Sequence, residues 1–378
     1  MGMKSLADME ERFWWLALSK VPGVGPMIFL RLLQKFGSPR EVFRASYQSL
    51  TQLDRVGPTL ARAIVEFSQQ EEVLRELERL DRMKIRMVLY NTPEYPAQLA
   101  NISDPPPILF VKGEILPQDK AAVAIVGSRA ASQQGLAVTR RLARELAGAG
   151  ITVVSGMARG IDSEAHKGAL AVGGRTIAVL GCGPNVIYPP ENRELFSRIT
   201  EQGAVVSEYS LDVKPDAVHF PSRNRIISGL CLGVTVVEAA PQSGSLITAR
   251  LALEQGRDVF AVPGHVDSMR SRGTNRLIRE GARLVETAQD ILEELRPALE
   301  GWIRPHAESS MEQSQDKEPL SAEEEKLLGI LEEGEQIHID TLILKSGFPP
   351  SKTSSLLLQL ELKNMVRQLP GKRFVRCS

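Results

Sequence analysis

Short segments rich in Gly, Ser and Arg recur along the middle of the chain. Glycine leaves backbone N–H groups open, hydroxyl groups donate hydrogen bonds, and the planar guanidinium group of Arg matches the oxygens of phosphate. Together these groups indicate a site that binds a polyanion and does not catalyse a reaction on it. The segments are Gly127-Ser128-Arg129, Ser155-Gly156-Met157-Ala158-Arg159-Gly160-Ile161-Asp162, Gly181-Cys182-Gly183-Pro184, His219-Phe220-Pro221-Ser222-Arg223-Asn224-Arg225 and Pro241-Gln242-Ser243-Gly244-Ser245.

These segments adjoin short apolar runs that predict strands. Continuous apolar runs are typical of strands covered on both faces, and their alternation with helix-length segments predicts a doubly wound, mostly parallel α/β sheet. The carboxyl ends of parallel strands share one edge, so we expect the Gly- and Arg-rich segments to form one binding edge there. The predicted strands are residues 122–126, 151–154, 176–180, 204–206, 233–237, 258–262 and 282–285.

Common signatures of cofactor and metal sites do not occur in the sequence. The first strand–helix turn lacks the G-x-G-x-x-G of dinucleotide sites, and there is no G-x-x-x-x-G-K-[ST] motif for ATP. The five histidines are scattered without metal-ligand spacing. We therefore expect no metal, no cofactor and no catalytic residue.

Four polar residues at predicted strand ends or helix starts could instead suggest catalysis. Asp162 and His166 would share a helix face, and Glu208 and Glu238 end predicted strands. None has a nucleophile or metal motif beside it. We expect Asp162 to cap its helix and His166 to be a hydrogen-bonded helix residue. Both glutamates are expected to be structural, or hydrogen-bonded to ribose or base edges.

The composition favours a cytoplasmic protein. The 378 residues are 43% hydrophobic, and 46 basic side chains balance 46 acidic ones. No apolar run approaches the roughly 18 residues of a membrane span, and charged residues interrupt the N-terminus where a signal peptide would be apolar. Three widely spaced cysteines predict no disulfide framework. Arginine supplies 17 of the 19 cations in residues 121–290, which suits phosphate, although a high G+C genome produces the same bias.

Four parts follow one another along the chain. Residues 1–84 predict helices whose glycine turns, at 21–26 and 54–58, are similar to paired helix-hairpin-helix units; a plain helical bundle is the alternative. Residues 85–296 form the core, which begins with two predicted strands joined by a proline-rich loop. Residues 297–319 are a predicted linker in an acidic region. Residues 320–378, which are basic in their second half, predict the three helices and hairpin of a winged-helix module.

The core motifs resemble those of the bacterial DNA-processing protein A family (DprA/Smf). The resemblance covers about residues 90–290, and the flanking parts are similar to that family's variable modules. It rests on Gly127-Ser128-Arg129, Ser155-Gly156-x-Ala158-x-Gly160-Ile161-Asp162, Gly181-x-Gly183, Tyr188-Pro189, Phe220-Pro221-x-Arg223-Asn224-Arg225-Ile226-Ile227, Ser243-Gly244-Ser245-Leu246-x-Thr248-Ala249 and Val262-Pro263-Gly264.

The resemblance implies an extended Rossmann-like core in a cytoplasmic homodimer that binds single-stranded DNA, protects incoming DNA in natural transformation and helps load the RecA recombinase. No enzymatic activity is implied. Some family members carry a basic residue after Tyr-Pro where this chain has Pro190, so no phosphate contact is assigned there. The DNA-binding residues implied by motif are Gly127, Ser128, Arg129, Ser155, Gly156, Arg223, Asn224, Arg225, Ser243, Gly244, Ser245 and Thr248.

Two other functions stay open at this point. The sheet is also similar to that of nucleotide-monophosphate phosphoribohydrolases, whose P-G-G-x-G-T-x-x-E turn supplies a catalytic Glu, but this chain has Ala249 at that position. Alternatively, the terminal modules could bind duplex DNA while the sheet senses a nucleotide. In the tail, Lys352, Lys363, Lys372, Arg373 and Arg376 favour duplex binding, whereas the lack of a polar base-reading cluster favours a protein-interaction or dimerisation module.

Overall fold

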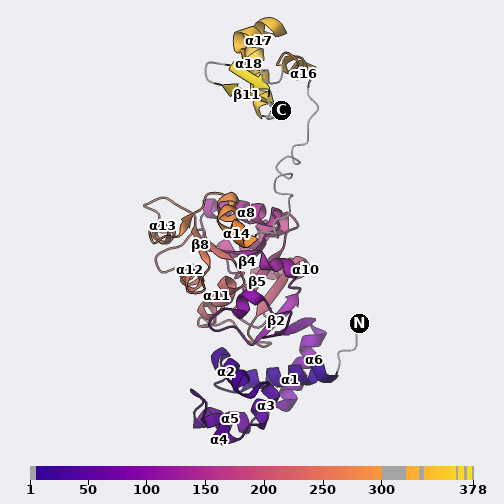
Figure 1. The fold of residues 1–378 in the computed structure, drawn as a ribbon, viewed down its shortest axis with the longest axis vertical. Coiled ribbons are helices and arrows are strands. Elements are labelled where there is room, and N and C mark those ends of the chain that lie inside the picture. The colour runs from indigo at the N-terminus through magenta and orange to yellow at the C-terminus, as the bar shows by residue number, and fades with distance from the viewer. Residues whose placement is uncertain (1–5, 300–320, 332–335, 363–364, 370–372, 377–378) are drawn as a thin grey trace. The chain divides into compact units, whose positions relative to one another are not determined.

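A computed structural model describes residues 6–299, 321–331, 336–362, 365–369 and 373–376 (Figure 1). The chain forms two compact units, residues 1–307 and 308–378. The predicted domains 1–84 and 85–296 therefore lie within a single unit. Most of the predicted linker is outside the described residues, and its first residues are helical, because α14 (Ala288–Leu299) continues through Pro297.

The first unit begins with six helices around one apolar cluster. Both predicted glycine turns are present: Gly25 and Gly57 are N-cap residues, each followed by Pro at the start of the helix. Proline is tolerated there because the first N–H groups of a helix have no intrahelical acceptor. The helices are α1 (Leu6–Lys20), α2 (Pro26–Phe36), α3 (Pro39–Arg44), α4 (Tyr47–Thr51), α5 (Pro58–Val65) and α6 (Gln70–Arg82).

A nine-stranded sheet follows, in the order β1-β2-β6-β5-β4-β3-β7-β8-β9. The predicted parallel sheet is confirmed, since β3 to β9 all pair in parallel. The β1–β2 hairpin extends it by antiparallel pairing of β2 with β6. The strands are β1 (Ile85–Leu89), β2 (Ile108–Gly113), β3 (Ala122–Val126), β4 (Thr152–Ser155), β5 (Thr176–Leu180), β6 (Ala204–Ser207), β7 (Gly233–Val236), β8 (Asp258–Ala261) and β9 (Arg283–Leu284).

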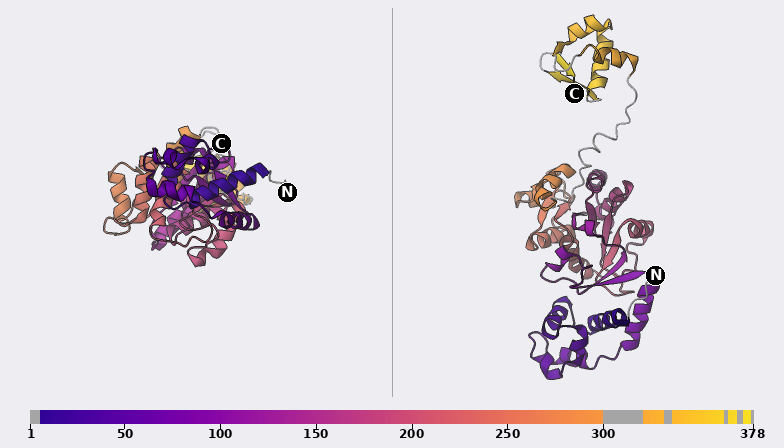
Figure 2. Two further views of the ribbon diagram at one scale, coloured as in Figure 1. Left: turned by 90° about the horizontal axis from the view of Figure 1, so that it is seen from below. Right: turned by 45° about the vertical axis from the view of Figure 1, so that its right-hand side comes forward.

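Helices cover both faces of this sheet (Figure 2). Alternate residues of β3 show the two cores: Ala124 and Val126 belong to one buried cluster, Val123 and Ile125 to the other. This is why the strand reads as a continuous apolar run. One face carries α8 (Gln133–Gly148), α9 (Ile161–Ala171), α10 (Arg193–Gln202) and α14, and the other carries α7 (Ala97–Ala100), α11 (His219–Gly229) and α12 (Gly244–Glu254).

Helix α6 joins the helical region to the sheet. It buries Val73, Leu77 and Leu80 and also Glu76. Glu76 accepts a hydrogen bond from the backbone N–H of Leu211 at 3.0 Å, in the segment after β6, and lies 2.7 Å from the Nζ of Lys20. Burial alone would lower the pKa of Lys20, but the hydrogen bonds and charges of Glu76 and Glu72 together outweigh it and raise that pKa.

The second unit has the predicted winged-helix order of elements. Ser321 caps the first helix in a reciprocal capping box with Glu324. The apolar cluster of this unit includes Leu342, Leu357 and Phe374. The elements are α16 (Ala322–Leu328), β10 (Ile337–His338), α17 (Ile339–Ser346), α18 (Pro350–Leu362), β11 (Val366–Leu369) and β12 (Arg373–Arg376).

The buried Glu76 contact predicts a stability effect. Glu76→Ala leaves the N–H of Leu211 without its acceptor and the ammonium group of Lys20 with Glu72 as its remaining partner, and a buried unsatisfied polar group costs about 1–3 kcal/mol. We expect the free energy of unfolding in urea to fall by about that amount. Glu76→Gln, which keeps an acceptor for Leu211, should lose less. Glu78→Ala, an exposed change on the same helix, is the control; an equal loss there would contradict the prediction.

Candidate functional site

A cavity of about 870 Å³ opens at the carboxyl end of the sheet, where β3 and β7 lie side by side. The strand order reverses between these two strands, so the loops after them diverge and leave a crevice. Loops after five strands and the helices α9, α11 and α12 contribute to its wall. Nine of the predicted site residues line the cavity: Gly127, Ser128, Arg129, Arg223, Asn224, Ser243, Gly244, Ser245 and Thr248.

Glycines let two strand-end turns pack directly against each other. A Cβ on Gly160, whose φ is +75°, would lie 2.3 Å from the carbonyl oxygen of Ser128. The N–H of Ile161 donates to the same carbonyl at 3.2 Å. The turn that carries Arg129 is therefore held by the start of α9.

The start of α12 lines the cavity, and the N–H of Gly244 makes no hydrogen bond within the described residues. The Ser243 hydroxyl accepts from the N–H of Ser245 at 3.4 Å, and nothing lies within 4 Å of a Cβ built on Gly244. The first turn of α12 carries no acidic residue. The amino end of this eleven-residue helix attracts anions through its dipole and the free N–H of Gly244.

Arg129 and two aromatic rings form a partly exposed stack on the cavity wall. The guanidinium carbon of Arg129 lies 5.1 Å from the ring centre of Phe220, and the Phe220 and Tyr188 rings are 5.8 Å apart. Arg129 is exposed, and within the described residues it makes no side-chain hydrogen bond and no ion pair. Its hydrogen-bond donors are free for a ligand.

Arg223 lines the same cavity but faces inward. Only 4% of it is exposed, and its Nη1 donates to the carbonyl of Gly156 at 2.8 Å and to that of Val179. A Cβ on Gly156 would lie 2.6 Å from this guanidinium group, so glycine is needed there. Burial lowers the pKa of Arg223, and the nearby Asp162 offsets part of that effect. Arg223 therefore places a positive charge beneath the surface of the cavity, and most of its N–H donors are already hydrogen-bonded within the protein.

Three predicted residues do not line this cavity. Arg225 lies between Asp104 at 3.0 Å and Glu208 at 2.5 Å and is 6% exposed, which argues against a phosphate contact and gives it a structural role. The buried Ser155 hydroxyl donates to the carbonyl of Ile125. Gly156 lines a smaller adjoining cavity of about 30 Å³ that also includes Arg129, Tyr188 and Phe220.

The four polar residues that could have suggested catalysis have structural partners. Glu238 accepts from the N–H and hydroxyl of Ser132, which caps α8, and Glu208 pairs with Arg225. Asp162 accepts from the N–H of Ala158 at 3.4 Å, and burial raises its pKa. Burial lowers the pKa of His166 to about 3, and its Nδ1 hydrogen-bonds to Thr176.

The sequence interpretation missed that residues 219–229 form a helix, α11, instead of a turn. With helical spacing, Arg223 falls on the same face as Ile226, Ile227 and Leu230, which are buried. That spacing was the signal that Arg223 points inward. Within the described ranges, no helix could span a membrane and no cluster of His, Cys, Asp or Glu could hold a metal ion.

Comparison with known families covers nearly the whole chain. Residues 86–296 match the model of DNA recombination-mediator protein A. The chain belongs to this family. Residues 311–372 match the DprA winged helix domain, and residues 16–70 match a SAM-like helix-hairpin-helix tandem.

Individual family members agree with this assignment. Protein Smf of Synechocystis is 34% identical, and the alignment covers 97% of this chain and 99% of the relative. The crystal structure of DprA from Streptococcus pneumoniae is 36% identical with a TM-score of 0.64, covering 78% of this chain and 99% of that one. A Helicobacter pylori DprA structure, described as showing a unique mode of single-stranded DNA binding, is 32% identical with a TM-score of 0.51; it covers 56% of this chain and 97% of that one.

The buried position of Arg225 predicts that its loss affects folding first. Arg225→Ala leaves the carboxylates of Asp104 and Glu208 without their cation. Breaking a buried ion pair by removing one partner costs about 3–5 kcal/mol. We expect a fall of that order in the free energy of unfolding, with DNA affinity unchanged at temperatures where the variant stays folded. Arg250→Ala, an exposed change on α12, is the control; a DNA-binding defect in stable, folded Arg225→Ala would contradict this role.

Proposed function

We propose that this protein binds single-stranded DNA in the cavity at the carboxyl end of the sheet and carries out no reaction on it. The stack of Arg129, Phe220 and Tyr188 beside the open start of α12 is the observation that carries the proposal. It places a cation, aromatic faces and the free N–H of Gly244 in one cavity, and single strands are bound by cationic grooves with stacking surfaces.

Phosphate contacts provide most of the affinity in this proposal. The free guanidinium group of Arg129, the hydroxyl of Ser128 and the amino end of α12 face one space. Phosphate binding at such groups is independent of base sequence and weakens steeply with salt. Phe220 and Tyr188 provide stacking surfaces that accept any base. The single-stranded DNA binding described for the H. pylori relative supports this ligand.

The wider role follows from family membership. We propose that the protein protects incoming DNA during natural transformation, helps load RecA and works as a homodimer in the cytoplasm. The family match and the relatives named DprA support this role. No described residue is assigned to RecA or to a dimer contact.

An enzymatic function has less support. Ala249, at the position of the catalytic Glu of phosphoribohydrolases, is fully buried in α12. Glu208 and Glu238 are engaged with Arg225 and Ser132. We expect no release of free base from nucleoside monophosphates incubated with the protein, measured by chromatography against an authentic hydrolase. Turnover that co-purifies with the protein and disappears in Arg129→Ala would favour the enzyme.

Duplex DNA is a second candidate ligand, at the terminal modules. Nothing lies within 4 Å of a Cβ built on Gly25 or Gly57, so the starts of α2 and α5 are open, as helix-hairpin-helix contacts to phosphate require. In the winged-helix unit, by contrast, Lys352 is paired with Glu323 and lies over the Phe348 ring. Lys363 and Lys372 lie outside the described residues.

Arg129 gives the direct test of the cavity. Arg129→Ala removes a charge-assisted contact worth about 1.5–3 kcal/mol, so we expect single strands to bind about 10- to 100-fold more weakly. The slope of log affinity against log salt should shrink by about 0.7, the value for one phosphate contact on a single strand. Fluorescence anisotropy with labelled oligonucleotides measures both.

Arg144→Ala is the matched control, because Arg144 is exposed on α8 and makes no side-chain contact among the described residues. Equal affinities of Arg129→Ala and the unsubstituted protein would reject the cavity as the binding site. Tighter binding of duplex than of single strands by the full chain would favour the terminal modules.

A further inference from the structure

Helix α13 (Arg272–Arg279) carries a row of arginines that the proposed cavity does not use. Arg272, Arg276 and Arg279 occupy positions i, i+4 and i+7, which lie on one side of a helix. All three are exposed, whereas Gly273 and Thr274 on the other side are buried. We call these three residues the arginine row.

Two of the three arginines in the row have no carboxylate partner among the described residues. Arg272 and Arg279 make no side-chain hydrogen bond or ion pair there, and Arg276 is 2.7 Å from Glu280 in an exposed pair. Such an exposed pair contributes little to stability, so Arg276 can readily exchange Glu280 for another anion. Helix α13 contains no acidic residue, whereas α6 mixes Glu, Asp and Arg along its length. A face with an excess of positive charge favours a polyanionic partner.

The helix is fixed to the rim of the cavity. The carbonyl of Arg270 accepts from the N–H of Ala239 at 2.7 Å, and the N–H of Gly273 donates to the carbonyl of Ala239 at 2.8 Å. A Cβ on Gly273 would lie 2.5 Å from that carbonyl, so the backbones approach as closely as glycine allows. Ala240, next along the chain, lines the cavity.

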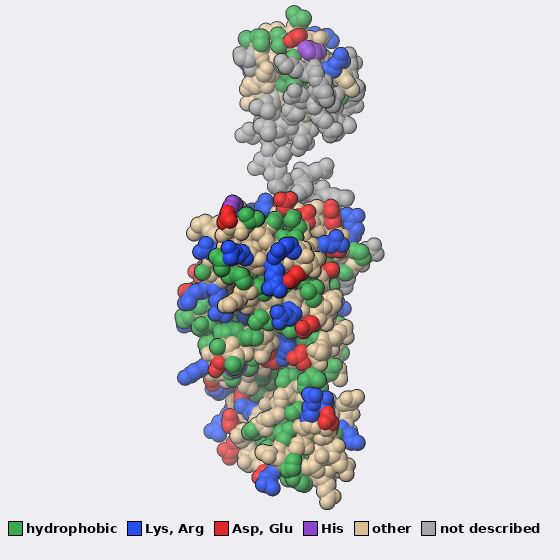
Figure 3. Space-filling model, turned by 90° about the vertical axis from the view of Figure 1, so that its left-hand side faces the viewer, with side chains coloured by type: hydrophobic (Ala, Val, Ile, Leu, Met, Phe, Trp, Pro, Cys, Tyr) green, Lys and Arg blue, Asp and Glu red, His purple; other side chains and the backbone are tan. Residues whose placement is uncertain are grey.

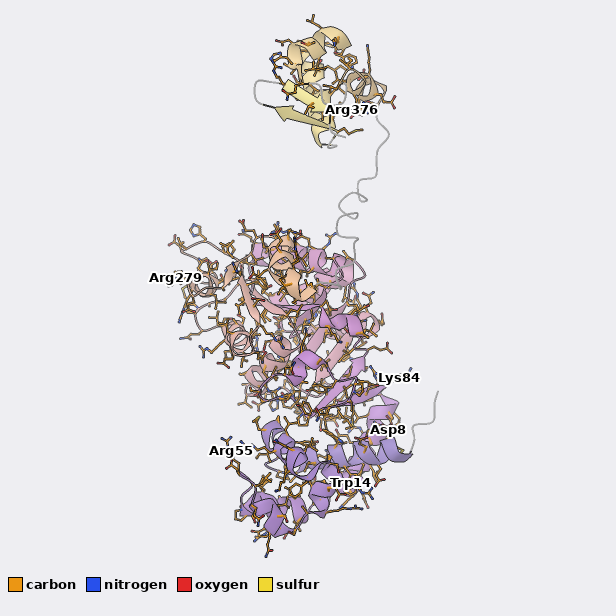
Figure 4. The ribbon with its side chains drawn as sticks, viewed as in Figure 1. Asp8, Trp14, Arg55, Lys84, Arg279 and Arg376 are labelled. Atoms are coloured by element: carbon orange, nitrogen blue, oxygen red, sulfur yellow. The ribbon has the colours of Figure 1, made fainter. Side chains whose placement is uncertain are left out.

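Arg270, just before α13, connects this helix to the loop after β3. Its Nε donates to the carbonyl of Ala130 at 2.9 Å, and Ala130, which follows Arg129, lines the cavity. Figure 3 looks onto this side of the molecule, where Lys and Arg side chains lie over the upper part of the core with Asp and Glu side chains among them. In Figure 4, Arg279 lies at the outer end of α13, away from the sheet. Exposed cations therefore lead from Arg129 past Arg270 to the arginine row.

We propose that a single strand bound in the cavity continues over α13, where the arginine row holds its phosphates. This inference rests on the proposed function and extends it from a cavity to a track. Strands long enough to leave the cavity gain the additional contacts, and short ones do not. The row thus selects for strand length without reading sequence.

Affinity measured with two strand lengths tests the track. We use the full chain with labelled oligothymidylates of about 4 and about 20 nucleotides, spanning the usual range of single-strand site sizes. The triple variant Arg272→Ala/Arg276→Ala/Arg279→Ala should bind the short strand within about twofold of the unsubstituted protein. It should bind the long strand about tenfold more weakly at low salt, with a salt slope smaller by about 2, as three phosphate contacts predict.

The matched control is Arg144→Ala/Arg193→Ala/Arg198→Ala, which removes the same charge from exposed positions on α8 and α10. Its long-strand affinity should exceed that of the α13 variant. Equal losses in the two triple variants, or no length-dependent loss in the α13 variant, would overturn the track. A change in the sedimentation of the DNA-free α13 variant would mark the row as a contact between protein chains and would also overturn it. Failure of the cavity is distinguishable, since Arg129→Ala would then leave short-strand binding unchanged.

Discussion

The guanidinium group of Arg223 lies beneath the cavity and joins the ends of two strands, because it donates to the carbonyls of Gly156 after β4 and Val179 within β5. Gly156 cannot be larger without displacing it. The same side chain lies 5.9 Å from the ring of Phe220, whose other neighbours are Arg129 and Tyr188. The buried guanidinium group of Arg223 thus supports the part of the cavity wall that carries Phe220, Tyr188 and Arg129.

Burying a cation is costly unless its donors are satisfied and an opposite charge is near. Asp162 provides that charge, and the backbone carbonyls provide the acceptors. The charge of Arg223 is therefore partly offset by Asp162, and its donors are largely hydrogen-bonded. The exposed Arg129 is left as the cation that can contact an anion in the cavity.

Arginines in this core therefore divide into two groups with different physical roles. Arg175, bonded to the buried Asp119, and Arg225, between two carboxylates, hold backbone segments together. Arg129, Arg272 and Arg279 are exposed and have no carboxylate partner within the described residues. The planar, five-donor guanidinium group serves both purposes, which is why a high arginine content alone does not locate a ligand.

The fold followed from the sequence because its signals are local. Continuous apolar runs predicted β3 to β9, and the residue types of the strand-end turns predicted the binding edge. Most of the candidate site could be named in the same way, since a strand-end position in a parallel sheet fixes the edge at which a residue lies. The motif resemblance added the ligand class.

Tertiary structure decided which arginines are available, because availability depends on partners distant in sequence. Arg223 and Arg225 lie in the same segment as Phe220. The guanidinium group of Arg223 is hydrogen-bonded to the carbonyls of Gly156 and Val179. That of Arg225 is paired with the carboxylates of Asp104 and Glu208. The link from Glu76 to Leu211 and the approach of α13 to Ala239 likewise join residues whose spacing carries no pattern. Sequence thus determined the sheet, its binding edge and the donor types; packing determined which donors remain free, because burial and pairing are properties of the assembled fold.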